Sequence, residues 1–295
     1  MLSPSHRFRG PLLMILATGS YVANDTLMKL ATEGLPPYQV LTMRGIAAAT
    51  WGFPLLLLLG HGPRLRQMFD RHVLARNLCE AGAVLCFIVA LANMPIADAT
   101  ALGQITPLIV LLGAALLFGE TITLLTIALI ACGFAGAMLV AQPTGEGLSI
   151  FASLALANAV LAAVRDLLGR KVRAEVPGLI VAMSAIVVVL AGAIVGHLAF
   201  EQWVAPSTTH ILLLAGAGFF LIFGHLFIFL SYRAGSASEV APFYYCFTVW
   251  AVISGVGVFG HFPNPEALAG IVLVIASGVL IVYLSARKRR LAPVS

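Results

Sequence analysis

The distribution of basic residues constrains the fold of this chain more than any other feature. The sequence contains seventeen Lys and Arg, and fourteen of them fall in clusters that alternate with pairs of long apolar stretches. Every second gap between apolar stretches is almost free of Lys and Arg. This is the positive-inside pattern of a chain that crosses a bilayer many times. The clusters are Arg7 and Arg9; Arg64, Arg66, Arg71 and Arg76; Arg170, Lys171 and Arg173; Arg233; and Arg287 to Arg290.

The composition also places the chain in a membrane. Hydrophobic residues make up 60% of the 295 residues and charged residues 10%. A soluble domain is about 45–50% apolar and about 25% charged, so this chain has too little polar surface to dissolve. Its net charge of +5 comes from flanks and loops, where it suits anionic lipid headgroups. No basic stretch with interleaved aromatic residues occurs in a polar context, so we expect a lipid bilayer and no nucleic acid as partner.

The apolar stretches predict the number of transmembrane helices. A helix that spans the bilayer needs about 20 mostly apolar residues. We count ten such stretches, which predicts an all-α polytopic membrane protein. The basic clusters then lie on one side, so both termini are expected in the cytoplasm, as residues 1–10 and 286–295. The stretches are 11–31, 38–59, 73–92, 97–118, 122–141, 148–168, 179–200, 209–232, 238–260 and 266–285.

The chain repeats itself at an offset of 141 residues. The two units, residues 11–141 and 147–285, hold five apolar stretches each. Because five is odd, the second unit enters the membrane from the opposite side, which predicts two inverted five-helix repeats of the kind that transporters use. The equivalent pairs are Asp25 and Asp166, Lys29 and Arg170, Pro36 and Pro177, Asp98 and Glu239, and Gly119-Glu120 and Gly260-His261.

The sequence shows no motif that is typical of an enzyme or of a metal site. The sequence has no Walker-type loop, no His pair with an interposed Glu and no serine nucleophile motif. We therefore expect no catalytic activity, no cofactor and no metal. Any pumping must use an ion gradient, the substrate's own gradient or a partner protein. The cysteines lie in apolar stretches, where we expect small apolar fillers: Cys79, Cys86, Cys132 and Cys246.

The fourth apolar stretch carries the motif that points to a family. It reads Ala99-Thr100-Ala101-Leu102-Gly103-Gln104-Ile105-Thr106-Pro107, followed by Leu116-Leu117-Phe118-Gly119-Glu120. A proline within the helix, followed about a dozen residues later by Gly-Glu, resembles the repeat signature of the ten-helix EamA-type branch of the drug/metabolite transporter superfamily. The second half keeps Gly260, but it has His261 where Glu is expected and Thr248 where Pro107 falls.

The resemblance extends from about Pro11 to Ser285 and implies a function. Members of this branch are secondary transporters, usually exporters of small metabolites, and this chain is similar to bacterial amino-acid exporters. It implies a small-molecule substrate, with aromatic or hydrophobic amino acids included, and a monomer that works by alternating access in the bacterial cytoplasmic membrane. One alternative is a drug, nucleoside or sugar exporter of the same fold. Another is an intramembrane enzyme or lipid-handling protein, but the sequence shows no ordered catalytic pair.

Polar side chains deep in the apolar stretches predict the substrate site. An ionisable group at the bilayer centre costs at least about 2.5–3.5 kcal/mol, so polar groups there face a partner, water or a substrate. Aromatic and amide side chains suit the apolar and polar parts of an amino acid. A hydrogen bond within the bundle is the alternative role for the amides and for the histidine. The substrate-binding candidates are Tyr21, Asn24, Gln104, Asn158, His225, Tyr244, Tyr245 and Trp250.

Charged residues in the same stretches are candidates for coupling or gating. For Asp166 we favour a solvated helix end as the alternative, and for Glu80 a pair with Arg76, one turn earlier. The candidates are Asp25, Glu80, Arg165 and Asp166.

Arg44 lies near the outer boundary of the second stretch. We expect it to pair with Asp25 or Glu33 or to extend outward along its apolar stem. Attraction of a carboxylate is the alternative.

The basic clusters generate a prediction about topology. Glu146 lies in a loop on the side opposite the clusters, and Arg289 lies in the C-terminal cluster. A Glu146→Cys variant should react with an impermeant thiol reagent added outside intact cells, whereas Arg289→Cys should react only after permeabilisation. Labelling of Arg289→Cys in intact cells would contradict the orientation.

Overall fold

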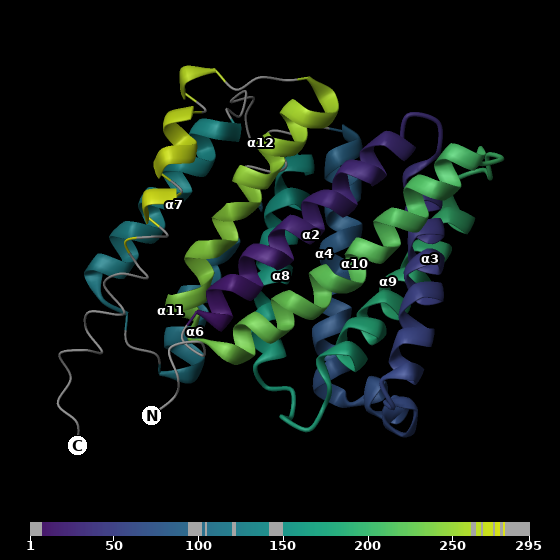
Figure 1. The fold of residues 1–295 in the computed structure, drawn as a ribbon, viewed down its shortest axis with the longest axis horizontal. Helices are drawn as coiled ribbons and strands as arrows, with labels where there is room; N and C mark the ends of the chain where they lie inside the picture. Colours follow the sequence, from purple (N-terminus) through teal and green to yellow (C-terminus); the bar gives the residue numbers. More distant parts are fainter. Residues whose placement is uncertain are drawn as a thin grey trace.

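The computed structural model is a bundle of helices that run up and down beside one another (Figure 1). It describes residues 8–93, 102–103, 105–119, 122–141, 150–260, 264–266, 268–273, 275–277 and 280, and every regular element in these ranges is a helix. The first half contains α2 (Arg9–Ala31), α3 (Pro37–Leu58), η1 (Gly62–Phe69), α4 (Arg71–Asn93), α6 (Thr106–Phe118) and α7 (Leu124–Ala141). The second half contains α8 (Ile150–Gly169), α9 (Gly178–Phe200), α10 (Thr208–Ala234), α11 (Ala237–Val240), η2 (Ala241–Tyr245) and α12 (Cys246–Phe259).

The helices have the length and composition that a bilayer requires. Within the described residues, six helices are long and apolar enough to cross a membrane: Pro37–Leu58, Arg71–Ala90, Ile150–Gly169, Gly178–Phe200, Thr208–Ala234 and Ala241–Phe259. Shorter apolar helices cover Thr106–Phe118, Leu124–Gly136 and Leu268–Ser277. With 23 residues α2 is long enough as well, but it carries Asn24, Asp25 and Lys29 and is therefore less apolar. The predicted all-α polytopic membrane fold is confirmed.

The helix bounds repeat at the offset found in the sequence. Arg9 and Ile150 begin α2 and α8, and Pro37 and Gly178 begin α3 and α9, each pair 141 residues apart. The residues before α3 and α9 are the equivalent prolines Pro36 and Pro177, which have the same extended backbone conformation, with φ of −60° and −61°. The repeated proline positions therefore mark equivalent helix starts.

The packing of the helices follows the same symmetry. Among the described helices, α2 packs most extensively on α10, and α4 on α8. In an inverted repeat of five spans α2 corresponds to α8 and α10 to α4, so these two pairs are equivalent. The first-half helix α3 also packs on its own counterpart, α9. Figure 1 shows α2 and α10 side by side through the middle of the bundle, with α3 and α9 together at one edge. The two halves form inverted repeats, as predicted.

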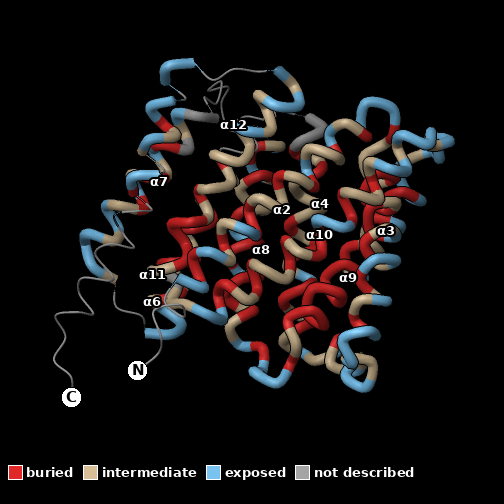
Figure 2. The backbone as a smooth tube through the Cα atoms, in the orientation of Figure 1, coloured by how far each residue is buried: buried red, intermediate tan, exposed pale blue. Residues whose placement is uncertain are grey.

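The outer surface of the bundle is apolar. Figure 2 shows the buried residues concentrated along the inside and the exposed ones around the outside. Leu58, Leu116 and Leu198 are 84%, 86% and 78% exposed, which in a soluble protein would be a large aqueous apolar surface. In a membrane protein lipid covers this surface, so the polar interior is the part that needs a chemical explanation.

Two short 3₁₀ helices differ from the sequence prediction. The ninth stretch was expected to be one continuous helix, but η2 interrupts it between α11 and α12. Pro242, within η2, has no N–H and cannot make the α-helical bond to residue 238, so the turn tightens. Between α3 and α4, where the sequence indicated a loop, η1 forms and buries Met68. The backbone carbonyl of Met68 accepts a 2.9 Å hydrogen bond from the hydroxyl of Ser184 on α9.

Asp70 ties η1 to the opposite half of the chain. Its carboxylate accepts a 3.0 Å hydrogen bond from the backbone N–H of His72, in the first turn of α4. It also accepts a 2.9 Å bond from the guanidinium of Arg173, in the loop between α8 and α9. These two interactions, the backbone N–H foremost, lower the pKa of Asp70 below its ordinary value. The end of the bundle at which α2 begins is therefore crosslinked between the repeats.

Glu201 connects the two repeats at the other end of the bundle. Its carboxylate accepts hydrogen bonds from the backbone N–H groups of Tyr38 and Gln39, at 2.7 and 2.9 Å. These donors belong to the first turn of α3, where a negative charge is favourable. The amide of Gln39 exchanges two hydrogen bonds with the backbone of Val204, at 2.6 and 2.9 Å. A residue that the sequence placed in a loop therefore caps a helix of the other half.

The glycines of the repeat signature end two equivalent helices. Gly119 follows α6 and Gly260 follows α12, with φ of 65° and 67°. This left-handed conformation is the common C-terminal stop of a helix, and glycine adopts it without strain. A methyl group added to either glycine would have no atom within 4 Å. Glycine is therefore needed at these two positions for its left-handed backbone conformation and not for close packing.

This conformation predicts a difference between two nearby glycines. Gly260→Ala should destabilise the protein by about 1–2 kcal/mol, because a Cβ is strained at this φ. Gly257→Ala is the matched control, since Gly257 lies within α12 with equally open space and no positive φ. Alanine there should be neutral or slightly stabilising. Thermal unfolding in detergent measures both, and equal losses would contradict the explanation.

Candidate functional site

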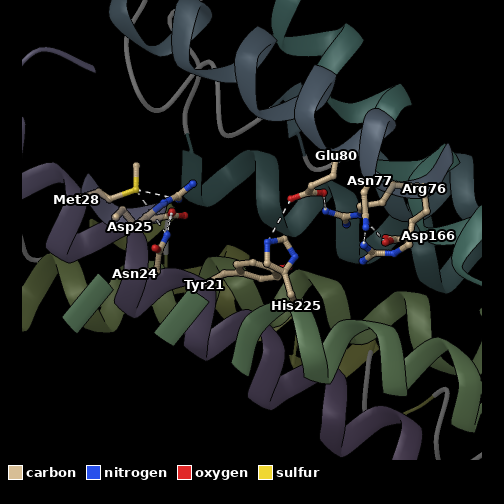
Figure 3. A network of polar contacts seen from close by, with 11 residues as sticks. Tyr21, Asn24, Asp25, Met28, Arg76, Asn77, Glu80, Asp166 and His225 are labelled. Carbon is tan, nitrogen blue, oxygen red and sulfur yellow. Dashed lines mark hydrogen bonds and ion pairs between the residues drawn. The ribbon is translucent and has the colours of Figure 1, made fainter. Parts of the chain in front are cut away.

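A chain of polar side chains runs through the interior and links α2, α10, α4 and α8 (Figure 3). These four helices form the two equivalent pairs described above. The chain extends from Asn24 and Asp25 on α2, through Tyr21 and His225, to Glu80 and Asp166. Such a run of polar groups inside an apolar bundle is expensive unless each group has a partner, water or a ligand.

Tyr21 and His225 join α2 to α10 at the middle of the chain. The Tyr21 hydroxyl lies 2.9 Å from Nδ1 of His225, and the two rings meet edge to face with centroids 5.5 Å apart. His225 is 2% exposed. The sequence predicted either a substrate contact or a hydrogen-bonded packing residue at this position, and in this structure His225 makes the hydrogen bond.

Glu80, Arg165 and Asp166 join α4 to α8. The guanidinium of Arg165 donates from one terminal nitrogen to Glu80 at 2.5 Å and from Nε to Asp166 at 2.7 Å. All three side chains are buried. The expectation of a solvated helix end is therefore wrong for Asp166, which is 4% exposed. Sequence spacing cannot show this burial, because it comes from the packing of α4 on α8.

The pairing expected for Glu80 is also corrected. The sequence suggested Arg76, one turn earlier on α4, but Glu80 pairs with Arg165 on α8. Arg76 instead donates a 2.6 Å hydrogen bond to Asn77 and lies over the ring of Phe229, 5.9 Å from its centroid. A buried carboxylate can pair with a cation on a facing helix as well as with one on its own helix. The closeness of Arg76 in the sequence therefore did not identify the partner of Glu80.

A small cavity lies beside Asp166, at one end of the polar chain. Its volume is about 10 Å³, and its lining includes Arg76, Asp166 and Tyr232. The second carboxylate oxygen of Asp166 and the hydroxyl of Tyr232 have no hydrogen-bond partner among the described residues. A space of this size with several polar walls fits one water molecule. Tyr232 is not among the residues predicted from the sequence, because its position at the end of an apolar stretch gave no sign that its hydroxyl is buried beside Asp166.

Asn24, Asp25 and Arg44 form a second polar cluster on the other side of Tyr21. The amide of Asn24 donates a 2.8 Å hydrogen bond to the Asp25 carboxylate. The guanidinium of Arg44, on α3, donates to the sulfur of Met28 at 3.0 Å. Asn24 and Arg44 are 1% and 5% exposed, whereas Asp25 is exposed. The expected extension of Arg44 towards solvent is therefore wrong.

The two clusters occupy equivalent places in the two repeats. Asn24 and Asp25 correspond to Arg165 and Asp166 at the offset of 141 residues. In both pairs the first side chain donates a hydrogen bond to the carboxylate of the next residue. Because the repeats are inverted, the pairs lie near opposite ends of the bundle. The repeat thus places one carboxylate on each side of the Tyr21–His225 contact.

Glu80 and His225 bring the two helix pairs together at the centre. Nε2 of His225 lies 3.7 Å from a carboxylate oxygen of Glu80. This separation is too long for a hydrogen bond but short enough for electrostatic attraction. A side chain of the α2–α10 pair therefore faces a side chain of the α4–α8 pair, and any passage between the two pairs has to separate these groups.

The remaining candidates lie around this chain rather than in it. Asn158 is half-buried on α8, and Tyr244 is half-buried in η2. Tyr245 is fully buried against Leu111 and Ile130. Trp250 donates its indole N–H to the backbone carbonyl of Ile15 at 3.1 Å and thereby fastens α12 to α2. Gln104 lies outside the described residues.

The comparisons with known proteins give the family. A model of the EamA-like transporter family matches the chain at residues 8–142 and again at 149–283. The chain belongs to the EamA-like transporter family. It is a multi-pass membrane protein of the transporter class, and each match covers one five-helix repeat. The family resemblance in the sequence is confirmed.

Curated relatives cover almost the whole chain and carry different substrates. A riboflavin transporter of Rhizobium johnstonii is 29% identical over 98% of this chain and 96% of its own. A pseudopaline exporter of Pseudomonas aeruginosa is 26% identical over 91% and 94%. An S-adenosylmethionine uptake transporter of Rickettsia prowazekii is 24% identical over 92% and 90%. A crystal structure at 19% identity shares the fold, with a TM-score of 0.81 over 95% of this chain and 98% of that protein.

The buried ion pairs of this transporter generate a stability prediction. Arg165→Met should destabilise the protein by about 3–5 kcal/mol, because Glu80 and Asp166 would stay buried without a counter-charge. Arg173→Met removes an exposed arginine that also pairs with an aspartate, and it should cost no more than about 1 kcal/mol. Denaturation in detergent compares the two variants. Similar losses would show that burial does not set the strength of the inner network.

Proposed function

We propose that this protein is a secondary transporter of amino acids or related zwitterionic metabolites. The observation that carries this proposal is the balance of charge along the interior polar chain. Asp25, Glu80 and Asp166 are matched by Arg44, Arg76 and Arg165, and five of these six side chains are buried. A pathway that carries both signs suits a solute that also carries both signs. A purely apolar solute would not interact with these charges, so it could not offset the free energy needed to hold them inside the bilayer.

The arrangement of helices supports alternating access between two pairs. The α2–α10 pair and the α4–α8 pair are equivalent under the inverted repeat and face each other at Glu80 and His225. In transporters with inverted repeats, one unit rocks against the other around a central site. We propose that the substrate passes between these two pairs, and that the protein acts as a monomer.

Direction and orientation complete the proposal. The basic clusters support a protein of the bacterial inner membrane with both termini in the cytoplasm. We propose net export, as the resemblance to amino-acid exporters implies. The relatives include both an exporter and an uptake transporter, so direction has to be measured separately from substrate.

The substrate class can be tested in proteoliposomes. Vesicles with the purified protein should take up labelled aromatic or branched amino acids and exchange them against the same amino acid inside, whereas protein-free vesicles should not. The same assay with an imposed proton gradient shows whether protons drive transport. Everted membrane vesicles then report direction, because an exporter accumulates substrate inside them.

The same assay tests the candidate residues. Asn158→Ala should lower transport several-fold while expression and melting temperature stay unchanged, since Asn158 is only half-buried on α8. Labelled riboflavin serves as the competing substrate. Transport of riboflavin without transport of any amino acid would contradict the proposed function.

A further inference from the structure

Arg44 is a buried cation with no oxygen acceptor among the residues that the structure describes. Among the described residues its guanidinium donates only to the thioether of Met28, at 3.0 Å, and its Nε atom has no partner. The other two buried arginines differ, since Arg165 donates to two carboxylates and Arg76 to the amide oxygen of Asn77. A thioether is a weak acceptor, and a buried charge without strong partners is costly. Arg44 therefore has unused capacity to bind an anion.

The packing of α3 on α10 fixes the position of this arginine. A methyl group on Gly218 of α10 would lie 2.9 Å from the backbone carbonyl oxygen of Arg44 and 2.5 Å from the backbone nitrogen of Ala48. The two helices are therefore in direct backbone contact beside Arg44. Its side chain starts from a rigid point and is directed into the bundle, where it is 5% exposed.

An acidic group with unused capacity lies nearby. Asp25 interacts electrostatically with Arg44, yet no ion pair within 4 Å joins them. The neighbouring amide oxygen of Asn24 is buried and has no partner among the described residues. Asp25 itself is exposed. A carboxylate within a span is costly against lipid, so such a group usually faces a partner, water or a ligand. The site thus holds an anion-binding group and two ammonium-binding groups, kept apart.

We propose that Arg44, Asp25 and Asn24 form the binding site for the headgroup of an α-amino acid. The Arg44 guanidinium takes the substrate carboxylate, while the Asp25 carboxylate and the Asn24 amide oxygen take the substrate ammonium. In this assignment the zwitterion bridges Arg44 and Asp25, which make no ion pair with each other within 4 Å. This proposal rests on the proposed function and names the residues that would read both ends of the substrate.

The chemistry of each group fits its assignment. A guanidinium offers parallel N–H donors that match the two oxygens of a carboxylate. An ammonium has three donors, which a carboxylate and an amide oxygen can accept together. Tyr21 lies on the same face of α2 as Asn24 and Asp25, one turn away, so the substrate side chain is placed against its ring. Aromatic and apolar amino acids would fit this arrangement best.

Stability in the absence of substrate gives the first test. If Arg44 binds a ligand, Arg44→Met should leave the melting temperature of the purified ligand-free protein unchanged or raise it, because a buried charge without strong partners is removed. Arg165→Met, the matched control at a saturated arginine, should lower it clearly. An Arg44→Met variant that melts as low as Arg165→Met would show that Arg44 is structural and would overturn the proposal.

Ligand analogues give the second test. L-phenylalanine, phenethylamine without the carboxylate, and 3-phenylpropionate without the amine compete for uptake of labelled phenylalanine. In the wild-type protein each missing group should weaken binding by at least about tenfold. In Arg44→Gln the penalty for the missing carboxylate should disappear, and in Asp25→Asn the penalty for the missing amine should disappear. Arg71→Gln, at an exposed arginine, should keep the wild-type pattern.

The outcomes separate the two proposals. Full discrimination in the variants, with phenylalanine transport intact, would overturn the headgroup site and leave the proposed function standing. Failure of the wild-type protein to transport or bind any amino acid would overturn both. Loss of discrimination in Arg71→Gln as well would show an unspecific effect of charge and would also overturn the assignment.

Discussion

The ion pair between Glu80 and Arg165 is the interaction on which the interior of this protein depends. Neither residue tolerates burial alone, because an unpaired charge in the bilayer or in a packed core is strongly unfavourable. Their contact joins α4 to α8, Arg165 also pairs with Asp166, and the other oxygen of Glu80 faces His225. The other polar contacts of the interior extend outward from this pair.

The two repeats share a backbone but not a charge pattern. Helix starts, extended prolines and left-handed glycines recur at 141 residues, whereas the interior side chains diverge. Glu80 corresponds to Leu221 and Arg165 to Asn24, so the ion pair has no counterpart across α2 and α10. There the equivalent interface is held by Tyr21 and His225, which are neutral partners. One helix pair is held together by buried charges and the other by a hydrogen bond between neutral groups, so the two equivalent pairs are stabilised by different interactions.

Much of the fold could be predicted from the sequence, because the all-helical membrane class and the repeat depend on patterns that are local or periodic. Basic clusters, apolar runs of about 20 residues and signature glycines need no knowledge of packing. The site was harder to predict. Asp25, Glu80, Arg165 and Asp166 could be selected because any charge in a span is unusual. Their partners could not, because Glu80 meets Arg165 across 85 positions in the chain.

Tyr21 gives the centre of the polar chain a property that a fixed donor would not. A hydroxyl can donate or accept, so the Tyr21 bond to His225 persists whichever ring nitrogen carries the proton. A main-chain amide in the same position would have permitted a single tautomer. The imidazole can therefore present either a lone pair or an N–H to Glu80 without any change in helix positions. The ring nitrogen of His225 that faces Glu80 can therefore be a hydrogen-bond donor or an acceptor.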